Sequence, residues 1–257
     1  MNKVAILYIC TGKYYVFWKD FYESFEKFFL LNSDKHYYVF TDKKRIYKEE
    51  SVNVHKIMQK SLGWPDNTLM RFSMFLRIEN ELKDYNYVFF MNANCICVNR
   101  VLEADFLPVG QNLLVVKHPG FYSKDNDEFD YDRNIMSTAY IEKGRGEFYV
   151  CGGVNGGTPE GFLKMAQELN SNILLDKSKK VIAKWHDESH LNRYILDRTD
   201  FKILSPSYCY PENWNLPFEP IIMVRDKSNW ISVDKVKQSF WTRMKMQIKR
   251  LKKCINK

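Results

Sequence analysis

The sequence predicts an α/β fold built around a largely parallel sheet. Short apolar runs with the length of buried strands, the first at Val4–Cys10, alternate with segments of helical spacing such as Tyr14–Leu31. This alternation is typical of folds in which helices cover a parallel sheet. With 257 residues and 45% hydrophobic content, the chain is long enough for one sizeable core.

In the first half of the chain, apolar periodicity separates strands from helices. In Tyr14–Leu31 the phenylalanines recur every three or four positions, which predicts a helix, and Asn67–Leu82 has the same pattern. Tyr87–Met91 is the most apolar run and predicts a buried strand. Further strands are expected at His36–Phe40, Val52–Ile57 and Cys95–Val98.

The second half continues the alternation. Leu113–Lys117 predicts a strand, and so does Phe148–Cys151, which runs into a glycine-rich stretch ending at Gly157. Thr158-Pro159 has the residue types of a helix start, with threonine at the cap and proline at the first position. A helix at Glu188–Leu196, a strand at Phe201–Leu204 and a polar loop at Tyr122–Tyr140 that could cover a site complete the predicted order.

The net charge of +8 is confined to the C-terminal end. Nine of the 39 basic residues and none of the 31 acidic ones lie in Lys235–Lys257, so residues 1–234 carry a net charge of −1. We therefore predict a neutral domain at 1–234 and a basic segment at 235–257. A neutral body argues against nucleic-acid binding.

Residues 240–257 place apolar side chains at helical spacing among lysines and arginines. A basic amphipathic helix would bind peripherally to an anionic membrane, and a solvated terminus is the alternative. The six cysteines are scattered and form no C-x-x-C pair, which predicts a reduced, cytoplasmic protein. The sequence has no run of 18 apolar residues, so we expect no transmembrane helix. The N-terminus lacks the pattern of a secretory signal, so we expect the mature protein to begin there.

Two segments carry the polar residues expected of a site. Asn92-Ala93-Asn94 ends the most apolar strand, where ligands bind in α/β sheets, although asparagines also favour simple turns. Trp185–His190 combines two carboxylates, two imidazoles and an indole. His186 and His190 are spaced to share a zinc ion, but the residue after His186 is aspartate where zinc proteases have glutamate. A helix start with acidic residues in its first turn is a compatible interpretation.

Four ordered motifs resemble glycosyltransferase family 6, which includes the ABO blood-group transferases and the α-1,3-galactosyltransferases. The most specific is Trp185–Asn192, with the sequence WHDESHLN. Three others support it, at Lys117–Tyr122, Phe148–Gly157 and Leu204–Tyr208. The resemblance implies a GT-A fold with a mixed sheet. It also implies transfer of galactose or N-acetylgalactosamine from UDP to the 3-hydroxyl of an acceptor galactose, with retention of configuration.

The resemblance also assigns roles to individual residues. Glu188 matches the catalytic carboxylate, which stabilises positive charge at the anomeric carbon or attacks it, and also contacts the acceptor. His118 and Trp185 match acceptor contacts. The remaining matches lie on the donor side and comprise Ile9, Thr11 and Tyr14 near the uridine, with Arg71, Asn92, Asn94, Cys151, Gly152, Gly153, Asp187 and Lys235 nearer the sugar and the diphosphate.

Cys151 and Gly153 fall at the two positions that separate A-type from B-type blood-group enzymes. Glycine at 153 leaves room for an N-acetyl group, so we expect UDP-GalNAc as donor, with UDP-galactose as the alternative. One methyl group discriminates by only about 1–3 kcal/mol. The family resemblance implies a galactose-terminated acceptor, 2-fucosylated as in the H antigen. The acidic acceptor contact of the family is shifted here, since Tyr210 and Pro211 precede Glu212.

The sequence departs from the mammalian pattern at the strand end. Asn92-Ala93-Asn94 stands where mammalian members hold Mn²⁺ with Asp-x-Asp, and neutral amides are weak ligands for a hard cation. We therefore expect an enzyme without a metal or other cofactor, as in bacterial members. Basic side chains would then balance the diphosphate, with Arg71, Lys227, Lys235 and Lys237 as candidates. A sugar-binding module without turnover and a zinc hydrolase remain the alternatives.

Overall fold

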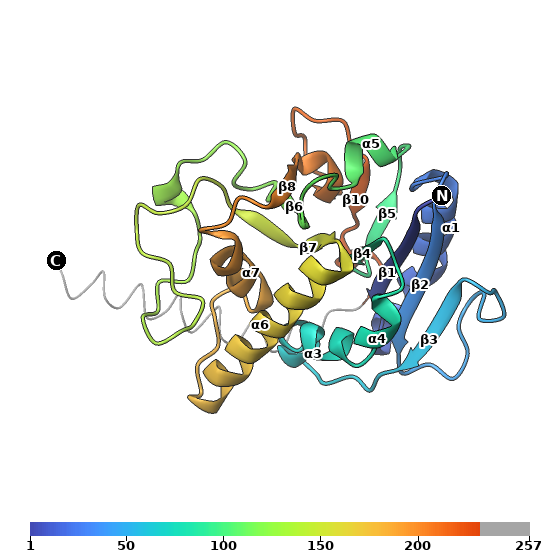
Figure 1. Cartoon of the computed structure of the whole chain (residues 1–257), viewed down its shortest axis with the longest axis horizontal. Coiled ribbons are helices and arrows are strands. Elements are labelled where there is room, and N and C mark those ends of the chain that lie inside the picture. The colour runs from blue at the N-terminus through green and yellow to red at the C-terminus, as the bar shows by residue number, and fades with distance from the viewer. Residues whose placement is uncertain (232–257) are drawn as a thin grey trace. The chain divides into compact units, whose positions relative to one another are not determined.

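The computed structural model describes residues 1–231 (Figure 1). The chain splits into two compact units, Met1–Arg225 and Asp226–Lys257. The second unit is described only at its start, where Lys227–Asn229 form a 3₁₀ turn, η4. The predicted boundary after residue 234 and the predicted amphipathic helix at 240–257 lie outside the described residues. Within residues 1–231, no helix is both long and apolar enough to cross a membrane.

The centre of the first unit is a seven-stranded sheet in the order β3-β2-β1-β4-β7-β6-β8. Its strands are parallel except β7, which pairs antiparallel with both β4 and β6. The sheet is therefore mixed and mainly parallel, in agreement with the expected fold. The strands are β1 (Lys3–Ile9), β2 (Asp34–Thr41), β3 (Val54–Met58), β4 (Tyr87–Met91), β6 (Leu113–Lys117), β7 (Val150–Gly157) and β8 (Phe201–Leu204).

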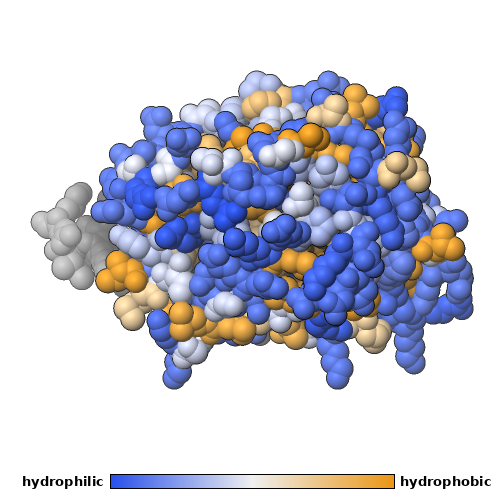
Figure 2. Space-filling model, viewed as in Figure 1, coloured by the Kyte–Doolittle hydropathy of each residue, from blue (hydrophilic) through white to orange (hydrophobic). Residues whose placement is uncertain are grey.

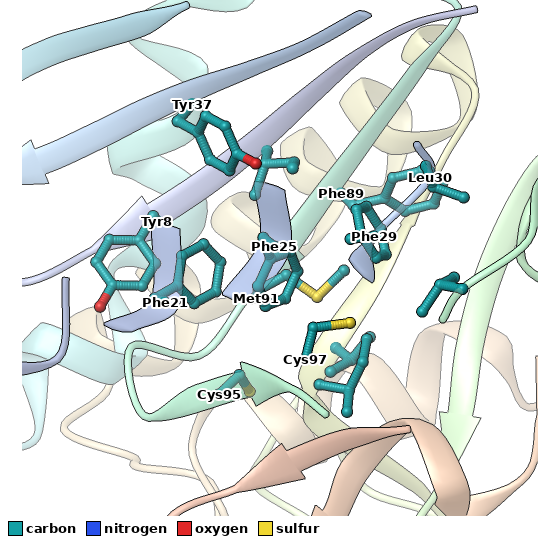
Figure 3. Close-up of a cluster of buried hydrophobic side chains, with 14 of the residues drawn as sticks. Tyr8, Phe21, Phe25, Phe29, Leu30, Tyr37, Phe89, Met91, Cys95 and Cys97 are labelled. Atoms are coloured by element: carbon teal, nitrogen blue, oxygen red, sulfur yellow. The ribbon is translucent and has the colours of Figure 1, made fainter. Parts of the chain in front are cut away.

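Alternate residues of β1 supply two separate cores, one on each face of the sheet. Ile6 and Tyr8 pack with helix α1 (Trp18–Phe28), whose Phe21 and Phe25 rings stack 4.0 Å apart (Figure 3). Leu7 packs on the other face, in a core shared with the helices α3 (Arg71–Leu76), α6 (Pro159–Ser178) and α7 (Asp187–Ile195). The period-2 alternation of a strand thus explains why the run is apolar throughout.

The helices have the following bounds. α6 (Pro159–Ser178) starts as predicted, with the Thr158 hydroxyl accepting a hydrogen bond from the Gly161 N–H. Figure 1 shows α6 lying across the same face of the sheet as α3 and α4. The others are η1 (Gly12–Phe17), α2 (Asp66–Leu69), α3 (Arg71–Leu76), α4 (Glu79–Leu82), α5 (Glu103–Phe106), η2 (Asn126–Glu128), α7 (Asp187–Ile195) and η3 (Pro206–Cys209).

Three predicted elements differ in the structure. The helix expected at Asn67–Leu82 is three short helices, because the backbone leaves helical geometry at Met70 and Ile78. The start of the helix expected at Tyr14–Leu31 is the 3₁₀ turn η1. The strand expected at Phe148–Cys151 begins at Val150 and continues through the glycine-rich stretch to Gly157.

A second sheet of three short strands begins directly after Asn94. It contains β5 (Cys95–Cys97), β10 (Ile222–Val224) and β9 (Tyr210–Pro211) in that order. Cys95 and Cys97 are both buried, as their alternation predicts. On the face shown in Figure 2, hydrophilic residues dominate the described part of the chain, with apolar residues in small separate groups.

β7 is glycine-rich because it passes between two strands at close range. A Cβ atom on Gly156 would lie 2.3 Å from the Val88 carbonyl oxygen and 2.3 Å from the Phe89 ring. Backbone cannot move aside as a flexible side chain can, so only glycine fits this position.

We predict that Gly156→Ala lowers the free energy of unfolding by about 3 kcal/mol or more, because the methyl group overpacks a closed sheet. Gly110→Ala is the control: it has a φ of +78° but open space around its Cβ. Its cost should be the backbone strain alone, about 1–2 kcal/mol. Chemical denaturation of both variants measures the difference, and equal losses would contradict the steric explanation.

Candidate functional site

The candidate site forms where three neighbouring strands meet at one edge of the sheet. β1 and β4 are parallel and in register at Tyr8 and Met91, so their carboxyl ends lie side by side. The Tyr8 hydroxyl donates to the Ala93 carbonyl oxygen at 2.8 Å and fixes the segment that follows β4. The antiparallel β7 begins at this same edge, and the Asn92 N–H donates to the Gly153 carbonyl oxygen at 2.8 Å.

The side chain of Asn192 joins helix α7 to β7 by two hydrogen bonds. The Asn192 side chain accepts from the Val150 N–H and donates to the Val150 carbonyl oxygen, both at 2.9 Å. Glu188 lies one helical turn before Asn192, so this pairing brings Glu188 beside the start of β7. His186, the residue before α7, has a φ of +54°, a strained conformation for a non-glycine residue that turns the chain into the helix.

The Glu188 carboxylate is held at both oxygens. One accepts from the Tyr149 hydroxyl at 3.0 Å and the other from the Gly152 N–H at 2.7 Å. Burial raises the pKa of Glu188 to about 7, and the two hydrogen bonds act against that rise. The group therefore ionises near neutral pH while its position stays fixed, which suits a carboxylate that faces a developing positive charge.

Asp187 forms a buried ion pair with Arg71. The Arg71 Nε atom lies 3.1 Å from the Asp187 carboxylate, and one Nη atom donates to the Gly152 carbonyl oxygen at 3.1 Å. Burial raises the pKa of Asp187 to about 6, and the guanidinium opposes this. Because Arg71 also lies 4.4 Å over the Phe90 ring, its charge is enclosed by protein and shared with its partner.

The backbone of β7 approaches these carboxylates so closely that side chains there must be small. A Cβ atom on Gly152 would lie 3.1 Å from Glu188 Cβ and 3.3 Å from an Asp187 carboxylate oxygen. A Cβ on Gly153 would lie 2.7 Å from the Asn92 amide nitrogen. The space beside Gly153 is thus bounded by Asn92, and Cys151, two residues earlier in β7, is buried.

The two predicted acceptor residues lie near Glu188 by different routes: His118 contacts Tyr149, and the Trp185 carbonyl oxygen accepts from the Glu188 N–H. The His118 N–H donates to the Tyr149 carbonyl oxygen at 2.8 Å, and the two rings are 5.5 Å apart. His118 Nδ1 accepts from the Gly120 N–H, and burial lowers its pKa to about 4, so the ring is neutral at pH 7. Trp185 is half exposed, and its indole N–H donates to Asp130 at 2.7 Å.

The predicted uridine residues follow β1. Ile9 ends that strand, Thr11 is buried, and Tyr14 lies in η1 with its N–H donating to the Thr11 carbonyl oxygen. They therefore share the sheet edge with Asn92. Asp42, after the neighbouring β2, accepts from the Gly12 N–H at 2.9 Å and holds this turn in place.

Asn94 has a structural role in this arrangement. Its side-chain amide donates to the Arg225 carbonyl oxygen at 2.6 Å, and the Arg225 N–H donates to the Asn94 carbonyl oxygen. Asn94 is buried by these contacts, which join the end of β4 to the end of the second sheet. Lys235 and Lys237 lie outside the described residues, and Lys227 belongs to the second unit.

The two histidines of the motif have separate surroundings. The His186 ring meets Trp64 edge-on at 5.0 Å, whereas His190 is buried beside Thr138 and lies 3.8 Å from Asp176. Among residues 1–231 there is no group of three histidine, cysteine or acidic side chains that could hold a metal ion. A zinc site at His186 and His190 is therefore not supported.

Three residues that shape the site were not singled out from the sequence. Tyr149, Asp130 and Asn192 each bond to a partner at least 39 positions away, so no local pattern points to them. Tyr149 and Asn192 do stand inside the quoted motifs. Their position within these motifs is the sequence signal that points to Tyr149 and Asn192.

Comparison with known proteins connects this geometry to a family. The family model described as glycosyltransferase family 6 matches residues 2–237. The Escherichia coli O-antigen biosynthesis glycosyltransferase WbnI is 37% identical over 224 residues, which cover 87% of this chain and 94% of WbnI.

Animal enzymes are more distant. The human globoside α-1,3-N-acetylgalactosaminyltransferase 1 and the rat histo-blood group ABO system transferase 1 are each 28% identical, over 81% of this chain. The match spans about three fifths of the length of these two enzymes, at 61% of each. With a family model that matches nearly the whole described chain and a close bacterial relative, this protein belongs to glycosyltransferase family 6.

Proposed function

We propose that this glycosyltransferase moves N-acetylgalactosamine from UDP-GalNAc to the 3-hydroxyl of a galactose-terminated glycan, forming an α-1,3 linkage with retention. The observation that carries the proposal is the Glu188 carboxylate, partly buried and held by Tyr149 and Gly152 at the edge of the sheet. Such a carboxylate, placed below the anomeric carbon, stabilises the positive charge that develops as the bond to UDP breaks. The bonding electrons leave with UDP, and the acceptor hydroxyl passes its proton to the departing diphosphate oxygen as its own oxygen bonds to the anomeric carbon.

The neighbouring residues suit the two substrates. Asp187 would bind donor-sugar hydroxyls, with its charge and position maintained by Arg71. His118, neutral at pH 7, and the half-exposed Trp185 ring would contact the acceptor galactose. Ile9, Thr11 and Tyr14 would hold the uridine at the end of β1.

The donor preference depends on the space beside Gly153. The human relative is named as an α-1,3-N-acetylgalactosaminyltransferase, which supports UDP-GalNAc as donor. However, the Asn92 amide nitrogen lies 2.7 Å from the position that a Cβ at 153 would take, so part of the room that glycine leaves is already filled. This contact favours UDP-galactose as the second candidate donor.

We further propose that the reaction needs no metal ion. Both asparagines of the motif are neutral, and the Asn94 amide is committed to the Arg225 backbone, so this pair does not fit a hard divalent cation. The charge of Arg71 is shared with Asp187, which leaves it less able to balance a diphosphate. Lys227, Lys235 or Lys237 would then supply that charge.

The acceptor and the location of the enzyme are also proposals. The name of WbnI places that protein in O-antigen biosynthesis, which supports a bacterial surface glycan as acceptor, with a 2-fucosylated galactose as the first candidate. We propose a cytoplasmic enzyme with peripheral membrane contact through 240–257.

The direct test is transfer to 2′-fucosyllactose in excess EDTA, with UDP-GalNAc and UDP-galactose compared as donors. We expect transfer, faster with UDP-GalNAc, and a loss of about a hundredfold or more in Glu188→Gln while UDP still binds. A requirement for Mn²⁺ would contradict metal independence, and full activity in Glu188→Gln would contradict the role of Glu188. Binding of both substrates without transfer would favour a sugar-binding module.

The pH profile of kcat/KM provides a second prediction. Because Glu188 must be ionised and burial raises its pKa to about 7, activity should fall as pH decreases through about 7. Tyr149→Phe removes a hydrogen bond to the ionised form, so its acidic limb should move to higher pH. The assignment of the acidic limb to Glu188 would be contradicted if the parent lost activity only near pH 4.5. It would also be contradicted if the acidic limb of Tyr149→Phe stayed at the pH of the parent.

A further inference from the structure

The indole of Trp185 is fixed by an aspartate that comes from the polar loop 122–140. The indole N–H of Trp185 donates to one carboxylate oxygen of Asp130 at 2.7 Å. The other carboxylate oxygen of Asp130 forms an ion pair with the Lys184 side chain. One carboxylate therefore holds two consecutive residues of the segment that leads into α7.

The backbone of this segment is fixed as well, by two further side chains. The Trp185 N–H of the main chain donates to the Ser189 hydroxyl at 2.9 Å, and the Lys184 N–H donates to Asp132 at 3.1 Å. Because the backbone is fixed, the indole ring can move only by rotation about the bonds of its own side chain. The bond to Asp130 fixes the ring edge, and Trp185 as a whole remains 47% exposed.

The loop itself is anchored to the helices beneath it. Asp176, buried in α6, accepts from the Ser137 hydroxyl at 2.9 Å and from the Thr138 N–H. Phe129, next to Asp130, is buried in a small aromatic cluster with Tyr149, whose hydroxyl contacts Glu188. The position of Asp130 is thus set by the same framework that sets the carboxylate.

We propose that Asp130 is a positioning residue for the acceptor: it orients the Trp185 ring so that its face receives the sugar. This inference rests on the proposed function. A sugar stacks on an indole face, so a ring free to rotate loses binding before it loses chemistry. The effect should therefore appear in the KM for the acceptor and not in kcat.

The test compares Asp130→Leu with Asp127→Leu, the same change on an exposed residue of the same loop. Asp130→Leu should raise the acceptor KM about tenfold, the size expected for a hydrogen bond to a charged group, with kcat within about twofold. Asp130→Asn keeps an oxygen that accepts from the indole and should restore most of the affinity. Asp127→Leu should match the parent.

A double variant tests whether Asp130 acts through the tryptophan. Trp185→Phe removes the indole N–H, so adding Asp130→Leu to it should raise the acceptor KM little further. Independent, multiplying effects would overturn the proposal, as would a loss in kcat alone or equal behaviour of Asp130→Leu and Asp127→Leu.

Failure of the proposed function is distinguishable, because it appears in the parent enzyme as absence of transfer. The indole N–H resonance of Trp185, assigned by its absence in Trp185→Phe, provides a readout independent of activity. It should exchange slowly with solvent in the parent and in Asp130→Asn, and rapidly in Asp130→Leu. Equal exchange in all three would overturn the proposal.

Discussion

Two adjacent carboxylates at the start of α7, Asp187 buried and Glu188 partly buried, are the constraint on which the rest of the site depends. Asp187 and Glu188 would be costly to hide from water if they had no partners. Asp187 has the Arg71 guanidinium, and Glu188 has the Tyr149 hydroxyl and the Gly152 N–H. The pKa of each nevertheless stays above its ordinary value, because burial outweighs these contacts. The ionised carboxylates are thus destabilised by burial, and a positive charge developing beside them would stabilise them.

The surrounding fold meets this constraint by bringing backbone and side chains close together. β7 runs antiparallel to its neighbours, so its first residues reach the edge where β1 and β4 end. Glycine at 152 lets that strand approach the carboxylates within van der Waals contact. Asn192 holds α7 against Val150, and Asp130 holds the segment before α7. Each contact joins segments distant in sequence, which makes the site rigid before any substrate binds.

Much of the fold follows from local patterns, whereas the site follows from them only in part. The buried strand β1 and the cap at Thr158 follow from local properties, and both were predicted. The break at Met70 was not, because the apolar residues keep helical spacing across it. Glu188 and Asp187 were predicted from a motif, but the Tyr149 hydroxyl, the Asp130 bond and the packing of Asn92 against Gly153 depend on tertiary contacts. The glycines of β7 do not indicate that this strand lies antiparallel between β4 and β6.

The most direct test of the buried carboxylate is the free energy of unfolding of Glu188→Gln and the parent between pH 5 and 8. A folded-state pKa of about 7 means that the folded protein binds the proton more tightly than the unfolded chain does, so the parent loses stability as pH rises from about 4.5 to 7. Glutamine carries no charge and escapes this loss. We expect Glu188→Gln to be more stable than the parent by about 1–3 kcal/mol at pH 8, with the gain vanishing near pH 5. A variant less stable than the parent by the same amount at both pH values would contradict the account.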